Sequence, residues 1–224
     1  LKDGESLEDT FSYTMTDREG GEDDAVLRIT INGVTDSEPT ITPEDHNNPD
    51  DPTDPLTAGH ATVYESGLVA GGPAGESKTA TGEITVDAKD GLVSVSVAGQ
   101  VFDLDSLAGL QANPVTIITD YGELTLTGFT PEVVNGITVG GKLSYSYELT
   151  KPFANAEPGQ AGDENGLDKI ELKVVDAGNA ESNGTLDINI IDDVPAANDD
   201  VNSIEENTAS VAGNVMSNDR EGAD

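Results

Sequence analysis

Residues 167–200 read LDKIELKVVDAGNAESNGTLDINIIDDVPAANDD, and this stretch decides the fold class. Apolar and polar residues alternate in two runs, which a Gly- and Asn-containing segment separates. Alternation with a period of two, on both sides of a turn, predicts an antiparallel pair of strands with one buried face. The apolar positions are Ile170, Leu172 and Val174 in the first run, and Leu186, Ile188 and Ile190 in the second.

The same pattern occurs once before, near the N-terminus. Residues 11–17 (FSYTMTD) align without a gap on residues 170–176 (IELKVVD), an offset of 159 residues (170 minus 11). A register held over this length indicates a long internal period, and hence a tandem array. At the same offset Asp9 falls on Asp168, Leu27 on Leu186, Ile29 on Ile188 and Ile31 on Ile190.

Three parts of the chain resemble a known family. FSYTMTDREGGEDDAVLRITINGVTD (11–36) is similar to the closing strands of cadherin-like (VCBS-like) repeats in giant RTX-type bacterial adhesins. Residues 63–195 resemble one repeat of the type I secretion adhesin repeat family. The strings NDD (198–200), IEE (204–206) and GNVMSND (213–219) resemble the opening of a further repeat.

This resemblance implies a role in cell adhesion and biofilm formation. It also implies type I secretion to the cell surface of a Gram-negative bacterium, with the export signal at the far C-terminus of a longer protein rather than in an N-terminal signal peptide.

The predicted fold is all-β, an antiparallel Ig-like or cadherin-like β-sandwich repeat with flanking partial repeats. Residues 1–36 are expected to be the C-terminal strands of a preceding repeat, 58–195 a complete repeat, and 196–224 the start of the following one. Residues 37–57 contain five prolines and many acids, which predicts a semi-rigid linker. A short helix over 105–111, capped by Asp105, is expected. Strands are predicted over 10–16, 25–32, 61–65, 80–87, 92–98, 115–119, 123–127, 143–149, 168–175 and 184–191, with hairpin turns at 90–91 and 121–122.

Composition narrows the function classes. The chain has 10 basic and 44 acidic residues, a net charge of −34, and no cysteine. Such a charge disfavours nucleic acid and anionic membrane surfaces as partners and favours divalent cations. The absence of cysteine excludes disulfides and thiolate metal sites. No apolar run is long enough to span a membrane.

Calcium is the expected cofactor, because it takes six to eight oxygen ligands. One candidate site is the hinge after the complete repeat. Its expected ligands are Asp192, Asp193, Asn198, Asp199 and Asp200, closed by Glu205 or Glu206 and by Asp219 from the following repeat.

A second candidate site lies at the preceding boundary, with Asp36, Glu38 and Glu65 as ligands. A third is the loop from Asp163 to Asp168. For each of these groups the alternative is a solvated acidic turn.

Catalysis is not expected. The two histidines lie in or beside the linker, and no nucleophile elbow, phosphate loop or dinucleotide motif occurs. The sequence therefore predicts a non-catalytic, monomeric, calcium-rigidified extender whose partners are neighbouring repeats of the same chain. The alternative is a calcium-dependent module that binds a peptide terminus or glycan on a host or bacterial surface, using the loops 69–78 and 151–166.

Overall fold

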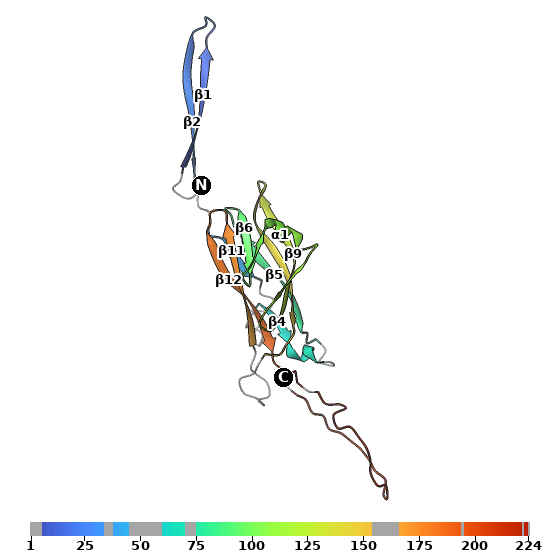
Figure 1. Ribbon diagram of the computed structural model, residues 1–224. Helices are drawn as coiled ribbons and strands as arrows, with labels where there is room; N and C mark the ends of the chain where they lie inside the picture. Colours follow the sequence, from blue (N-terminus) through green and yellow to red (C-terminus); the bar gives the residue numbers. More distant parts are fainter. Residues whose placement is uncertain are drawn as a thin grey trace.

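The computed structural model describes residues 6–33, 38–44, 60–69, 75–153, 166–193, 195–220 and 222–223. It confirms the predicted all-β sandwich, which is built from two five-stranded sheets. A two-stranded hairpin projects from one end of the sandwich, and the C-terminal segment extends from the other (Figure 1). No helix in the described part of the chain is long and apolar enough to cross a membrane.

The first sheet has the strand order β3-β5-β10-β9-β8 and the second the order β4-β12-β11-β6-β7. All neighbours pair antiparallel except β4 and β12, which are parallel. The strands of the first sheet are β3 (Thr40–Pro43), β5 (Thr79–Asp87), β8 (Val115–Ile118), β9 (Gly122–Val134) and β10 (Ile137–Leu149). Those of the second are β4 (Ala61–Tyr64), β6 (Leu92–Val97), β7 (Gln100–Asp103), β11 (Gly166–Asp176) and β12 (Glu181–Ile191).

The core lies between the sheets and consists of the apolar positions of the alternating runs. All six apolar residues identified in β11 and β12 are buried, as predicted, and Leu143, Tyr145, Tyr147 and Leu149 of β10 face them. Because each strand buries one face and solvates the other, period-two alternation sets the register of the whole sandwich.

The rings of two tyrosines of β10 pack against glycines of the two neighbouring strands, β5 and β9. A Cβ at Gly82 would lie 2.4 Å from the Tyr145 hydroxyl, and one at Gly122 would lie 2.5 Å from the Tyr147 hydroxyl. Glycine at these positions therefore makes room for a large ring in a core otherwise built from small aliphatic side chains.

The predicted linker and the predicted helix cap need correction. Thr40–Pro43, expected in the linker, instead form edge strand β3, which pairs with β5 and buries Ile41. Proline is compatible with this position because an edge strand has one side without a ladder partner. The helix α1 spans Leu104–Gly109, and its cap is Asp103 rather than Asp105. The Asp103 side chain accepts a hydrogen bond from the Ser106 N–H at 2.8 Å.

Other predictions fail because they considered neighbours in sequence only. Residues 90–91 do not form a hairpin turn, since β5 and β6 belong to different sheets. Strand β7 was not predicted, and β9 and β10 extend well beyond the predicted ranges. Glu65 lies outside β4, in the 3-10 helix η1 (Glu65–Leu68) that follows it.

The N-terminal hairpin, β1 (Ser6–Thr16) and β2 (Glu22–Asn32), repeats the pairing of β11 and β12. At the offset of 159, Phe11 opposite Leu27 corresponds to Ile170 opposite Leu186, and the other partners agree from Leu7 to Thr16. The turns agree as well. Asp17 Oδ1 accepts from the Gly21 N–H at 2.7 Å, as Asp176 Oδ1 does from the Ala180 N–H at 2.8 Å. Gly20 and Asn179, which correspond, both have positive φ.

The two hairpins differ in their surroundings. Every residue of β1 and β2 is exposed, so the described sandwich does not cover this hairpin.

The C-terminal segment leaves the sandwich after β12. Residues 195–220 and 222–223 of this segment are described, and none of them lies in a strand. An isolated bridge between Ala196 and Arg220 joins the part that leads away from the sandwich to the part that returns, and we call these parts its two arms.

Candidate metal centre

The parallel pairing of β4 with β12 brings two distant acidic residues together. Tyr64, the last residue of β4, is opposite Ile191, the last residue of β12. The next residues are Glu65 and Asp192, and parallel strands deliver them to the same end of the sheet. This is the end from which the C-terminal segment extends (Figure 1).

Asp193 completes the group. Glu65, Asp192 and Asp193 each offer a carboxylate oxygen, and these oxygens all lie within 4.8 Å of one another. Glu65 is fully buried and Asp193 is 8% exposed. We call these three residues the acid cluster.

Local contacts hold the acid cluster in place. Glu65 Oε1 accepts a hydrogen bond from the Phe153 N–H at 2.5 Å. Asp193 Oδ1 accepts one from the Ala223 N–H at 2.9 Å, which ties the end of the C-terminal segment to the sandwich. The other oxygen, Asp193 Oδ2, is buried and has no hydrogen-bond partner among the described residues.

This geometry suits a hard cation. Buried carboxylates that converge within a few ångströms repel one another, and burial increases that repulsion because the dielectric screening falls. A buried carboxylate oxygen without a donor costs free energy that a bound cation would recover. The donor set is all oxygen, which suits calcium or magnesium rather than the thiolate and imidazole sites of zinc.

The structure divides the predicted hinge site. Asn198, Asp199 and Asp200 are exposed and lie beyond the acid cluster on the first arm of the C-terminal segment. The Asn198 N–H donates to Asp219 Oδ1 at 2.7 Å, and Asn218 Nδ2 donates to the Asp199 carbonyl at 3.2 Å. These residues therefore join the two arms to each other.

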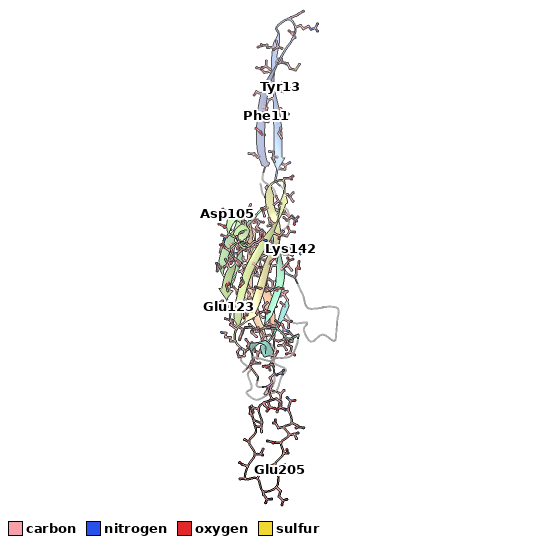
Figure 2. The ribbon with its side chains drawn as sticks, turned by 90° about the vertical axis from the view of Figure 1, so that its right-hand side faces the viewer. Phe11, Tyr13, Asp105, Glu123, Lys142 and Glu205 are labelled. Carbon is pink, nitrogen blue, oxygen red and sulfur yellow. The ribbon has the colours of Figure 1, made fainter. Side chains whose placement is uncertain are left out.

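Glu205 does not approach the acid cluster. It is exposed, lies outside any strand, and is drawn at the far end of the C-terminal segment (Figure 2). Glu205, which the sequence predicts to close the hinge site, is therefore not brought to the acid cluster in this structure. Glu206 is also exposed and forms part of a turn.

Asp168 lies in the core of the sandwich instead of an acidic loop. It is 2% exposed, and its Oδ2 accepts from the Tyr147 hydroxyl at 2.7 Å, the Thr119 hydroxyl at 2.6 Å and the Tyr121 N–H at 3.2 Å. Asp168 belongs to one sheet, and Tyr147 to the other. This carboxylate therefore links the two sheets by hydrogen bonds, a role that the sequence analysis missed.

Some predicted features lie outside the described residues. They are Asp36 and Asp163, residues 70–74 of the loop 69–78, residues 154–165 of the loop 151–166, and residues 37 and 45–57 of the predicted linker. Glu38 is described and exposed, but it is not part of the acid cluster.

One described groove lies between β7, α1 and β8. It is lined by Gln100, Val101, Phe102, Ser106, Gly109, Asn113 and Val115. None of these lining residues has a carboxylate, so the groove lacks the side chains that bind calcium most strongly.

A comparison of this chain with protein-family models finds no match, and a comparison with curated proteins finds none either.

Proposed function

We propose that this chain is a non-catalytic, calcium-binding repeat of a secreted cell-surface adhesin, where it acts as a calcium-rigidified extender. The observation that carries the proposal is the acid cluster, in which three carboxylates converge at the end of the sandwich and the buried Asp193 Oδ2 has no donor among the described residues.

Calcium at this position would join three parts of the chain. Glu65 belongs to η1, Asp192 directly follows β12, and Asp193 is hydrogen-bonded to Ala223 at the end of the C-terminal segment. One ion held by all three carboxylates would fix the direction in which the C-terminal segment leaves the sandwich. Calcium suits this role because it takes six to eight oxygen ligands in a flexible geometry, and these ligands can come from several segments of a chain.

The overall form supports a mechanical role. The hairpin and the C-terminal segment leave from opposite ends of the sandwich, so the molecule is long and narrow (Figures 1 and 2). The net charge of −34 resists compaction unless cations screen it. Units of this form in series would hold a distal binding region away from the cell, and cation binding at each junction would stiffen the series.

A calcium titration followed by thermal unfolding and small-angle scattering on the same samples tests the proposal. At calcium concentrations a hundredfold above the dissociation constant, binding to the folded state adds about 2.7 kcal/mol of stability. For a chain of this size that corresponds to a rise in Tm of about 5 to 10 °C. We expect the scattering to show a longer and stiffer particle at the same time.

Two results would change the conclusion. Equal Tm and equal maximum dimension with calcium and with chelator would refute the extender. A rise in Tm without a change in shape would place the ion within the sandwich, and would favour the calcium-dependent binding module. Magnesium is the matched control, because its strict octahedral geometry makes the same carboxylates a poorer ligand set for it than for calcium.

A further inference from the structure

The N-terminal hairpin has one apolar face and one polar face. On the polar face, Arg28 forms an ion pair with Glu8, and the Thr14 hydroxyl donates to Asp24 at 2.7 Å. The other face presents Phe11, Tyr13, Met15, Leu27, Ile29 and Ile31, all of which are 43% to 68% exposed. Figure 2 shows Phe11 and Tyr13 on the hairpin, beyond the end of the sandwich. An isolated two-stranded sheet is marginally stable in water, and a contiguous apolar face of this kind marks an interaction surface.

The hairpin β11–β12 shows what covers such a face. Its register equals that of β1–β2 position by position, and its corresponding apolar residues are all buried against the other sheet. Strand β6 pairs antiparallel with the edge of β11 that faces away from β12. Strand β4 pairs parallel with the edge of β12 that faces away from β11. Even the turn hydrogen bonds agree, so the two hairpins are the same structural element in two environments.

We propose that the apolar face of β1–β2 docks on the body of a second β-sandwich of the same architecture, joined ahead of the hairpin in the chain. At the offset of 159, that body would place an antiparallel strand along residues 13–17, at the end of β1, and a parallel strand along residues 29–32 of β2. The inference rests on strand registers and not on calcium.

Chain order identifies this occupant. In the described sandwich the strands that cover β11–β12 all precede them in sequence. The body described here, and that of any second copy of this chain, already holds its own β11–β12 in that position. Only a further body therefore has the position open.

Asp9 provides a specific contact for the docked state. It corresponds to Asp168, whose carboxylate accepts hydrogen bonds from Tyr147, Thr119 and the Tyr121 N–H. The covering body is therefore expected to present a tyrosine hydroxyl to Asp9. Asp9 is exposed in the undocked hairpin.

An extended chain tests the inference. A copy of residues 38–165 is joined directly ahead of Leu7, so that β1–β2 takes the position of β11–β12 in the added body. Leu27, Ile29 and Ile31 already equal their counterparts, but Phe11, Tyr13 and Met15 are larger than Ile170, Leu172 and Val174. The substitutions Phe11→Ile, Tyr13→Leu and Met15→Val remove that overpacking.

Hydrogen exchange, read by mass spectrometry on peptides from residues 6–33, is the measurement. We expect exchange in the adapted extended chain to be about a hundredfold slower than in the original chain, because docking adds opening free energy to each amide. Ile29→Lys on the apolar face should abolish that protection. Val26→Lys, on the polar face of the same strand, should keep it, because its counterpart Thr185 is exposed in β12.

The inference is overturned if the hairpin exchanges at the same rate in the extended and the original chain while residues 166–191 stay protected. It is also overturned if Ile29→Lys leaves the protection intact. Asp9→Asn supplies a second readout, and docking predicts faster exchange only in the extended chain. Because the rates are compared at one calcium concentration, failure here is distinct from failure of the calcium titration.

Discussion

Tyr64 and Ile191 are partners in the one parallel strand pair of the described sheets, so Glu65 and Asp192 leave the sandwich side by side. The acid cluster depends on this relationship. The residues that directly follow two strands distant in sequence, β4 and β12, supply its carboxylates, and the C-terminal segment returns to it through Ala223.

Replacing Asp193 by Asn tests the acid cluster with a nearly isosteric change. We expect calcium affinity to fall by about tenfold or more, since the loss of a ligand should exceed the tenfold to hundredfold losses known for the groups that support ligands. In chelator the sign should reverse, with the Asp193→Asn variant more stable than the parent chain, because one buried negative charge has gone. Isothermal titration and thermal unfolding, with and without calcium, measure both effects.

Asp199→Asn is the matched control for that experiment. Asp199 carries the same charge a few residues further on, but it is exposed and outside the acid cluster. Equal effects of the two substitutions on calcium affinity would show that calcium responds to overall acidity and not to the acid cluster.

The sequence predicted the residues of the acid cluster but not their grouping. Asp192 and Asp193 were assigned to a hinge with Asn198 to Asp200, and Glu65 to a different boundary with Asp36. Nothing in local spacing shows that β4 runs parallel to β12, because that pairing depends on the fold as a whole. Asp168 was misassigned for a related reason. Its hydrogen-bond donors lie on a strand of the other sheet and in the loop before β9.

The fold itself was more predictable. Alternation identified the buried faces of β10, β11 and β12, because burial of one face imposes a period of two. It could not identify β3, whose four residues follow Pro39, end in Pro43, and gain their burial from β5. The alternation of residues within one strand likewise does not predict which strands distant in sequence pair with each other.

Tyr147 and Tyr145 form a natural pair for testing the inter-sheet link. Both are buried on β10, but only Tyr147 donates to Asp168, and the Tyr145 hydroxyl has no partner in the described part of the chain. We expect Tyr147→Phe to lower the free energy of unfolding by about 1.5 to 3 kcal/mol, the usual range for a hydrogen bond to a charged group. Tyr145→Phe should be neutral or stabilising. Guanidinium unfolding measures both, and equal losses would contradict the link.

The same tyrosines predict a loss of stability in alkali. Burial raises the pKa of Tyr145 to about 12, above the ordinary value of about 10. Burial, followed by the hydrogen bond to Asp168, raises the pKa of Tyr147 as well. Since folding favours the protonated form, this stability is complete below pH 10 and is lost as the pH rises from about 10 to 12. The free energy of unfolding, measured between pH 10 and 12, should fall less steeply with pH for Tyr145→Phe than for the parent chain.

Gly122 and Gly128 both lie on β9 and test how closely the strands approach. A Cβ at Gly122 would lie 2.4 Å from the Glu148 carbonyl oxygen, whereas nothing lies within 4 Å of one at Gly128. Because a backbone oxygen cannot move aside without shifting β10, Gly122→Ala should destabilise the sandwich by about 1 to 3 kcal/mol. Gly128→Ala should be neutral, or stabilising by about 0.4 to 1 kcal/mol through the reduced entropy of the unfolded chain. Chemical denaturation of the two variants gives the comparison. Equal stabilities would mean that β9 and β10 are further apart at Gly122 than the structure has them.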